Sequence, residues 1–297
     1  MITVSVPGKI HLMGEHAVVY GKPALLSAIN RRMRVSIEKS KKMEIITTES
    51  SSYMLYALEK VKEYLKLDAL PSMRVTIVSD IPAGFHLGSS AATAVGLVAA
   101  LIYFLKKTWN PTLINAIAYE VEKKQHGNPS GGDNTTVTFG GLVWFRKELE
   151  FLKSMQQLDI VIPSAFNHFF LIDTGRPKET TGEMVAFVKT QKNLQAFLDA
   201  NEIQTKNILV GIKEKDEKAL IDAIQQGEKT LEEIGVVSKK VIPIIRSIEK
   251  IGGAAKILGG GGRKEGIGYL LCYSHNPPKG SIPIVLGEEG VRLERKL

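Results

Sequence analysis

The alternation of apolar and polar residues in the first half of the chain predicts β-strands separated by glycine, proline and lysine-rich turns. Residues 2–6 and 9–13 alternate on either side of Pro7-Gly8, so we expect the first strand to break at that dipeptide. Residues 33–40 and 42–47 are expected to pair around a lysine-rich turn. Further strands are expected at residues 73–79 and 137–145.

Apolar residues that recur with the helical period predict helices in both halves of the chain. In the first half they cover residues 53–65, 89–105 and 111–124. In the second half a strand at 168–172 precedes helices at 182–201, 204–226 and 238–251, and strands follow at 255–258, 266–272 and 282–286. This order of elements predicts an α+β fold of two domains, residues 1–165 and 166–297.

Residues 82–105 join a turn with two glycines and paired serines to a long, nearly uncharged helix. Ser89 and Ser90 lie where an N-cap is expected. A helix that begins on such a loop presents backbone N–H groups and the positive end of its dipole, which suits a phosphate group. From this stretch alone, a phosphate cradle and a buried helix after a turn are equally good interpretations. A membrane span is disfavoured, because the apolar segment is shorter than about 20 residues.

The composition of the 297 residues is that of a globular protein, with 44% apolar and 24% charged side chains. The single cysteine, Cys272, excludes a disulfide framework and fits a reducing compartment. The first residues do not resemble a secretory signal, so we expect a cytoplasmic protein that does not bind membranes. The formal net charge of +8 comes from scattered lysines, which favours anionic small molecules such as ATP over nucleic acid as partners.

Several familiar nucleotide-binding and catalytic patterns are absent from the sequence. It contains neither G-x-x-x-x-G-K-[ST] nor G-x-G-x-x-G, and it lacks the HRD and DFG motifs of protein kinases and the HExxH motif of zinc enzymes. If the loop at residues 82–90 binds a nucleotide, it must therefore do so by another architecture.

Two polar clusters are candidates for chemistry. The first cluster consists of Lys9, Glu15 and His16. Lys9 follows the Pro-Gly break, and its side chain either neutralises an alkoxide or a phosphate or is simply solvated. In the second, Glu122 lies in the last turn of a helix, where the dipole disfavours a carboxylate, so it is a candidate cation ligand. Asp133, at the end of QHGNPSGGD, is either a base for a hydroxyl group or a turn-forming aspartate.

A run of four glycines near the C-terminal end forms a third cluster: Gly259, Gly260, Gly261 and Gly262. Consecutive glycines are entropically costly unless the backbone must approach something closely. Either a ligand or a neighbouring backbone segment would meet that description.

In this order, the motifs PGKIHLMGEHAVVYGKPAL, GSSAA, HGNPSGGDN, GVVSKK and the late glycine run resemble those of the GHMP small-molecule kinases. HGNPSG-x-DN is the most specific of them and is typical of the mevalonate kinases. The resemblance covers nearly the whole chain. It implies an N-terminal domain like domain 2 of ribosomal protein S5, a ferredoxin-like C-terminal domain, and a cleft between them for nucleotide and substrate.

The reaction that the resemblance implies is the ATP-dependent phosphorylation of the 5-hydroxyl of mevalonate, giving 5-phosphomevalonate and ADP. Residues matching the phosphate-binding loop are Gly84, His86, Leu87, Gly88, Ser89, Ser90 and Ala91. The resemblance further implies that Ser90 and Glu122 hold Mg²⁺ and that Asp133 is the base, with Lys9 beside it. The implied contacts to mevalonate come from Glu15, His16, Lys178 and Thr180. Homodimers are common in this family, so the resemblance is compatible with a homodimer.

Two residues and one three-residue segment depart from the family pattern. His86 replaces a glycine, so either the imidazole contacts phosphate or solvent, or nucleotide affinity falls. Lys178 stands where relatives often carry arginine, which turns a bidentate carboxylate contact into a point contact. Arg263-Lys264-Glu265 follow the glycine run and either reach a phosphate or lengthen a turn. Two alternatives therefore stay open: a GHMP kinase for phosphomevalonate, homoserine or a sugar, and a non-catalytic ligand-binding relative.

Overall fold

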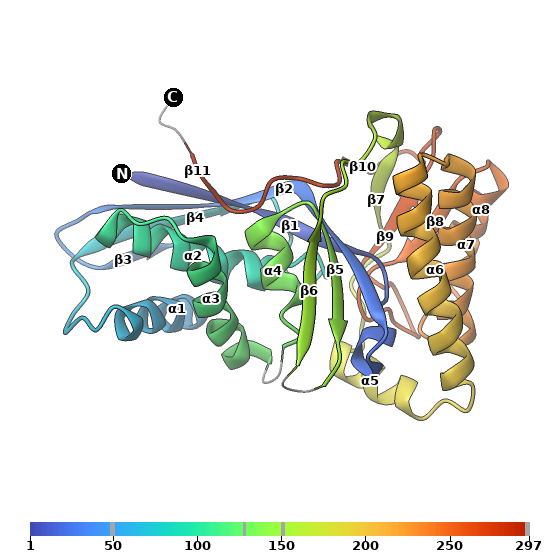
Figure 1. Cartoon of the computed structure of the whole chain (residues 1–297), viewed down its shortest axis with the longest axis horizontal. Coiled ribbons are helices and arrows are strands. Elements are labelled where there is room, and N and C mark those ends of the chain that lie inside the picture. Colours follow the sequence, from blue (N-terminus) through green and yellow to red (C-terminus); the bar gives the residue numbers. More distant parts are fainter. Residues whose placement is uncertain (48–50, 127–128, 150–151, 295–297) are drawn as a thin grey trace.

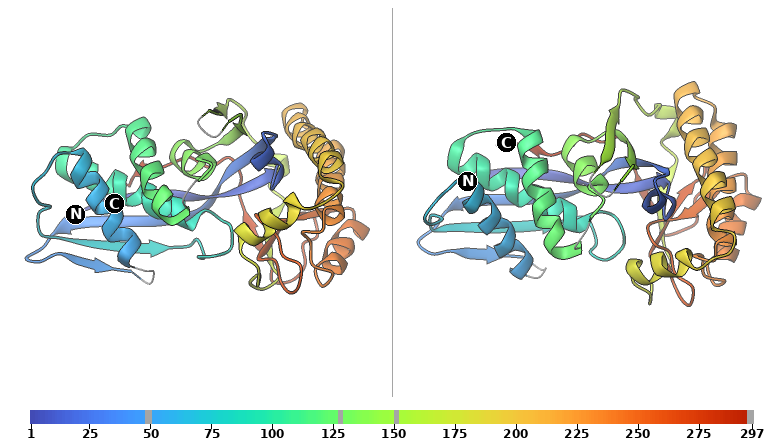
Figure 2. Two further views of the ribbon diagram at one scale, coloured as in Figure 1. Left: turned by 90° about the horizontal axis from the view of Figure 1, so that it is seen from below. Right: turned by 60° about the horizontal axis from the view of Figure 1, so that its bottom comes forward.

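The computed structural model describes residues 1–47, 51–126, 129–149 and 152–294, which form two β-sheets placed side by side along the long axis of the molecule (Figure 1). Helices pack against both sheets, and most of the helical mass of the second half lies at one end of the molecule (Figure 2). This mixed architecture confirms the predicted α+β class.

The first sheet is built on the long hairpin of β1 (Ile2–Met13) and β2 (Pro23–Lys39). Its strands follow the order β11-β1-β2-β4-β3, where β3 is Glu44–Ile46, β4 is Met73–Ser79 and β11 is Arg292–Leu293. The first residues of β2 pair with β5 (Leu142–Lys147) as well as with β1, and β6 (Lys153–Leu158) lies beyond β5. The long β2 thus serves two groups of partners along its length.

Two predictions for this sheet are wrong. The first strand does not break at Pro7-Gly8, because a register shift between these residues lets the ladder to β2 continue past the proline. The segment at 42–47 does not pair with β2, because β2 already has β1 along one edge and β4 along the other. Its residues form β3, which runs parallel to β4.

The described residues of this half form four α-helices, α1 (Ser51–Tyr64), α2 (Ser89–Lys106), α3 (Pro111–His126) and α4 (Gly132–Phe139), and two short 3-10 helices, Ala17–Tyr20 and Ser164–Phe166. The central one, α2, approaches the sheet closely at Gly96, where an added Cβ would lie 2.7 Å from Val35 Cγ2. By length and composition α2 would pass for a membrane span, but most of it is buried inside the protein. The structure therefore places it as a core helix.

The strand predicted at residues 137–145 is only partly correct. Residues up to Phe139 belong to α4, and the strand β5 begins at Leu142. Gly140 and Gly141 separate the two elements with φ values of 74° and 69°, a backbone region that favours glycine. The glycine pair is thus the signal that divides helix from strand.

The second sheet has the order β10-β7-β9-β8, with β7 (Phe169–Asp173), β8 (Ala254–Ile257), β9 (Tyr269–Tyr273) and β10 (Ile282–Ile284). Its helices are α5 (Thr181–Lys189), α6 (Leu194–Glu214), α7 (Glu217–Glu233) and α8 (Ile242–Lys250). Their boundaries differ from the three predicted segments. Lys215, at a φ of 58°, ends α6, and Asp216 caps α7 by accepting a hydrogen bond from Ala219 N–H at 2.9 Å.

The chain returns to the first sheet at its end, where β11 pairs with β1. This return segment is held by Arg32, whose buried guanidinium donates to the carbonyl oxygens of Glu289 and Gly290 at 2.8 and 2.7 Å. Burial lowers the pKa of Arg32 to about 10. The first sheet therefore contains residues from both ends of the chain, and the division into domains at residue 165 stays a prediction.

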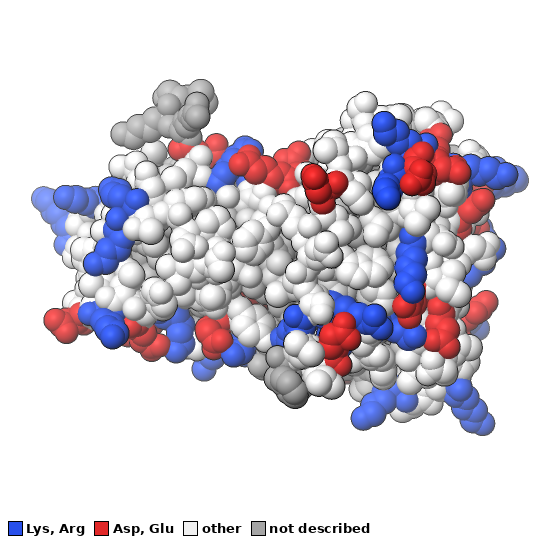
Figure 3. Space-filling model, in the orientation of Figure 1, with Lys and Arg blue, Asp and Glu red and all other residues white. Residues whose placement is uncertain are grey.

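Charged side chains on the face shown in Figure 3 are of both signs and lie mainly around its margins. The middle of this face is largely uncharged. The positive net charge is thus not gathered into a single basic stripe on this side of the molecule.

Candidate active site

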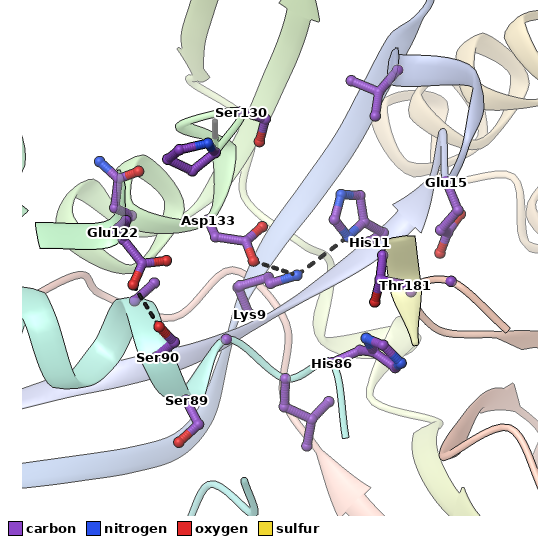
Figure 4. Close-up of a pocket in the computed structure, with 18 of the residues that line it drawn as sticks. Lys9, His11, Glu15, His86, Ser89, Ser90, Glu122, Ser130, Asp133 and Thr181 are labelled. Carbon is purple, nitrogen blue, oxygen red and sulfur yellow. Dashed lines mark hydrogen bonds and ion pairs between the residues drawn. The ribbon is translucent and has the colours of Figure 1, made fainter. Parts of the chain in front are cut away.

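A cavity of about 480 Å³ lies where the end of β1, the loop before α2, the starts of α2, α4 and α5 and the glycine run meet (Figure 4). Fourteen of the predicted site residues line it: Lys9, Glu15, His16, Gly84, His86, Leu87, Gly88, Ser89, Ser90, Ala91, Glu122, Asp133, Gly259 and Gly260. The remaining four, Lys178, Thr180, Gly261 and Gly262, lie outside the wall that the structure describes.

The loop before α2 is shaped by alternating left-handed residues. Gly84, His86 and Gly88 have φ values of 82°, 62° and 79°. Gly88 is the N-cap of α2, so the predicted serine cap is wrong: the chain enters the helix from the left-handed glycine, and the serines form its first turn. The first hydrogen bond inside the helix runs from Ala92 N–H to Gly88 O at 2.9 Å. Earlier N–H groups cannot bond within the helix, which makes this wall suited to an anion.

The predicted metal ligands Ser90 and Glu122 are in contact. Ser90 Oγ donates to Glu122 Oε1 at 2.5 Å, and the hydroxyl of Tyr53, from α1, donates to the same oxygen. Hard oxygen donors suit Mg²⁺, whose adjacent ligands in an octahedral shell lie about 2.9 Å apart. The described residues contain no cluster of three or more His, Cys, Asp or Glu side chains able to hold a metal. The pair thus fits an ion whose other ligands are water and phosphate oxygens.

Lys9 and Asp133 form the centre of the cavity (Figure 4). The Lys9 ammonium is buried and lies 3.0 Å from Asp133 Oδ2 and 3.4 Å from His11 Nδ1. Burial and the neighbouring ammonium lower the pKa of His11 to about 3, so the neutral ring accepts the hydrogen bond from Lys9. Gly88 makes room for this lysine, because an added Cβ would lie 2.8 Å from Lys9 Cγ.

Glu15 and His16 stand in a strained turn at the end of β1. Ala17 N–H donates to Glu15 O at 2.6 Å and His16 has a φ of 60°, the geometry of a γ-turn with positive φ. One oxygen of Glu15 pairs with the buried Lys256, and Oε2 has no partner in the described structure. Burial raises the pKa of Glu15, and Lys256 opposes that effect.

The tautomer of His16 follows from its contacts. Nε2 lies 3.1 Å from Gly260 O, which only accepts, so Nε2 carries the proton. Burial lowers the pKa of His16, which leaves Nδ1 as a lone-pair acceptor without a partner among the described residues. Glu15 and His16 therefore offer two acceptors to a ligand with hydroxyl groups. We call His11, Glu15, His16 and Thr181 the Glu15 wall; the labelled members lie across Lys9 from Ser90 and Glu122 in Figure 4.

Lys178 and Thr180, the predicted substrate contacts from the second half of the chain, are not among the described residues that line the cavity. Lys178 pairs with Glu265 at 3.4 Å, outside the cavity. Thr180 caps α5, where its side chain accepts from Glu183 N–H in a capping box, and the next residue, Thr181, lines the cavity. The guanidinium of Arg263 lies 4.0 Å from the centroid of the Phe187 ring rather than in the cavity wall.

Several residues of the site escaped the sequence analysis. His11 follows Lys9 by two positions on a strand, and this spacing places both on one face, so the sequence did hold a signal for it. Tyr53 and Lys256 reach the site from distant segments, and no local pattern marks them. Within the HGNPSG motif, Gly127 and Asn128 lie outside the described residues.

Comparison with known proteins gives a consistent result. Residues 52–141 match the sequence profile of the GHMP kinases N terminal domain. The chain is 35% identical over 303 residues to a mevalonate kinase from Archaeoglobus fulgidus, covering 98% of this chain and 99% of that protein. It is 28% identical over 346 residues to a mevalonate kinase from Pyrococcus abyssi, covering 99% and 98%. The crystal structure of the Methanococcus jannaschii mevalonate kinase superposes with a TM-score of 0.78 at 21% identity, covering 98% and 96%.

Proposed function

The chain belongs to the GHMP kinases, and from this premise we propose that it transfers the γ-phosphoryl group of ATP to the 5-hydroxyl of mevalonate. The products are 5-phosphomevalonate and ADP. Similarity to mevalonate kinases over nearly the full length supports this choice of acceptor.

The observation that carries the proposal is the pair of Lys9 Nζ and Asp133 Oδ2, 3.0 Å apart, in the same cavity as the N-terminus of α2. A phosphoryl transfer to an alcohol needs a group that takes the hydroxyl proton and a cation beside the attacking oxygen. Both groups are present at one point, next to a helix start suited to the nucleotide phosphates.

Each residue then has a task in a direct transfer. Asp133 takes the proton as the O–H bond of the acceptor breaks, and the freed oxygen forms the new bond to the γ-phosphorus. The bond between the γ-phosphorus and the bridging oxygen breaks, and ADP leaves. Lys9 stabilises the charge on the attacking oxygen, and the backbone N–H groups at the start of α2 orient the phosphates. No covalent enzyme intermediate is needed.

Ser90 and Glu122 would hold Mg²⁺, which neutralises phosphate charge when bound. Both side chains offer oxygen ligands, Ser90 from the start of α2 and Glu122 from α3, and in Figure 4 they lie across Lys9 from the Glu15 wall, which supports this assignment. The Tyr53 hydroxyl orients the Glu122 carboxylate from α1.

The Glu15 wall supports an acceptor with hydroxyl groups. Glu15 Oε2 and His16 Nδ1 are both acceptors, and either can accept the one hydrogen bond that the 3-hydroxyl of mevalonate donates. A phosphorylated acceptor is less well served, because Lys9 is the one lysine or arginine among the described residues of the cavity wall. This charge count favours mevalonate over phosphomevalonate.

The test is a coupled assay of ADP release with mevalonate, phosphomevalonate, homoserine and galactose. We expect release with mevalonate, and Asp133→Asn should lower kcat by about 10²–10⁴-fold while ATP binding is retained. Release with another acceptor but not with mevalonate would replace the substrate. Binding of Mg-ATP without release in any case would favour a non-catalytic relative, and turnover that survives Asp133→Asn would contradict the base assignment.

A further inference from the structure

His86 lies in the middle of the loop before α2, and its imidazole forms part of the cavity wall (Figure 4). Its φ of 62° lies in the left-handed region, where glycine is favoured and a side chain is disfavoured. His86 thus carries a large side chain at a position whose backbone conformation favours glycine. What the ring contacts determines what it can do.

The imidazole ring packs against Gly259 and Gly268 from the second half of the chain. A Cβ added to Gly259 would lie 2.3 Å from His86 Cγ, and one added to Gly268 would lie 3.8 Å from Cδ2. A side chain at position 259 would therefore displace the imidazole. This close contact fixes the ring at the boundary of the Glu15 wall.

The imidazole is neutral and has hydrogen-bonding capacity to spare. Burial and the Lys9 ammonium lower the pKa of His86 to about 4. His16 also lowers this pKa, whereas Asp133 raises it. A neutral imidazole carries one N–H donor and one acceptor nitrogen. Among the hydrogen bonds of the described residues, none involves this ring. His86 therefore has a donor available for a ligand.

The Glu15 wall has no spare cation for an anionic group. Glu15 Oε2 and His16 Nδ1 are both acceptors, and a carboxylate next to them would meet lone pairs. Lys9, the one lysine or arginine in the described wall, is engaged with Asp133. Lys178 pairs with Glu265 outside the cavity. An acceptor carboxylate must therefore be bound by neutral donors, of which the cavity offers the His86 ring, His11 Nε2–H and the Thr181 hydroxyl.

We propose that His86 donates a hydrogen bond to the carboxylate of the acceptor and thereby selects an anionic hydroxylated acceptor over a neutral one. This inference rests on the proposed phosphorylation of mevalonate, whose carboxylate lies at the opposite end from the reacting hydroxyl. In Figure 4, His86 and the Ser90–Glu122 pair lie on different sides of Lys9. An acceptor with its 5-hydroxyl at Asp133 can thus extend toward the imidazole.

The experiment compares the wild type, His86→Gly and His86→Gln with mevalonate and with 3-methylpentane-1,3,5-triol, in which a CH₂OH group replaces the carboxylate. We expect His86→Gly to raise the KM for mevalonate about tenfold or more, the usual effect of losing a hydrogen bond to a charged group. The KM for ATP and the KM for the triol should stay within about twofold, because neither ligand brings a carboxylate to this ring. His86→Gln retains an N–H donor and should lose less.

His86→Gly is expected to fold, because glycine suits the left-handed backbone at this position, and a thermal melt checks both variants. A rise in the KM for ATP without a rise for mevalonate would overturn the inference, since the ring would then serve the phosphates. Equal changes for mevalonate and the triol would also overturn it. Mevalonate turnover that is insensitive to His86→Gly refutes this inference alone, whereas a wild type without turnover of any carboxylate acceptor refutes the proposed function as well.

Discussion

Replacing Lys256 by methionine removes the cation that balances Glu15 in the interior of the protein. The exposed fractions of the two side chains are 0% and 2%, and the ammonium also donates to Ile257 O at 2.6 Å. Methionine preserves most of the side-chain volume, so the change isolates the charge. Burial already raises the pKa of Glu15 against the field of Lys256. Without that field, we expect a loss of about 3–5 kcal/mol in the free energy of unfolding, as for other buried pairs that lose one partner.

The assay is urea unfolding at pH 7 of the wild type, Lys256→Met, Glu15→Gln and the double variant. The double variant should recover much of the loss, because it leaves neither member of the Lys256–Glu15 pair as an unpaired buried charge. Lys240→Met is the matched control: its pair with Glu265 is exposed, at 64% and 38%, and should contribute less than about 1 kcal/mol. A loss below about 1 kcal/mol for Lys256→Met, or a double variant as unstable as the sum of the single ones, would refute this reasoning.

Three further changes probe the cavity. Tyr53→Phe removes the hydroxyl that orients the Glu122 carboxylate, a proposed Mg²⁺ ligand. We expect the Mg²⁺ concentration for half-maximal rate to rise several-fold while the KM for the acceptor is unchanged. A Mg²⁺ titration with no shift would count against this role. Lowering the pH from 7 to 5 should reduce the free energy of unfolding by about 4 kcal/mol from His11 and His86 together, because their native pKa values of about 3 and 4 lie below the ordinary 6.5 and the unfolded state takes up the protons. Urea unfolding across this pH range checks it, and in His11→Gln the free energy of unfolding should fall less steeply with pH. Gly88→Ala should lower kcat/KM at least tenfold, because the added methyl group would lie 2.8 Å from Lys9 Cγ. Gly280→Ala has a similar φ but lies in open space, so it should leave the kinetics unchanged. Equal effects of the two substitutions would point to backbone strain alone.

The sequence predicted well those parts of the fold and site that depend on local patterns. The strand at residues 73–79 agrees with β4 at both ends, because alternation is read directly from neighbouring residues. The approach of Lys9 to Asp133 followed only from the resemblance, since it joins a strand to a helix 124 positions later in the chain. Long-range contacts of this kind leave no mark in periodicity.

One prediction that failed depended on competition between distant partners. Which strand pairs with residues 42–47 is decided by the edges that β1 and β4 already occupy on β2. Glu265 pairs with Lys178 outside the cavity, a long-range contact that residues 174–181 by themselves do not reveal, and the contact of Lys178 with mevalonate stays a prediction. Tyr53 and Lys256 were missed because each acts on a carboxylate from another element.

The return of the chain to β1 has a consequence for biosynthesis. A nascent chain is made from its N-terminus, so β1 and Arg32 leave the ribosome long before the residues that complete their surroundings. Until residues 289–293 arrive, the edge of β1 lacks its β11 partner, and the Arg32 guanidinium lacks the carbonyl oxygens of Glu289 and Gly290. Residues 289–293 must therefore be synthesised before the first sheet can close, and until then a ribosome-bound chain exposes this edge to any chaperone or strand that pairs with it.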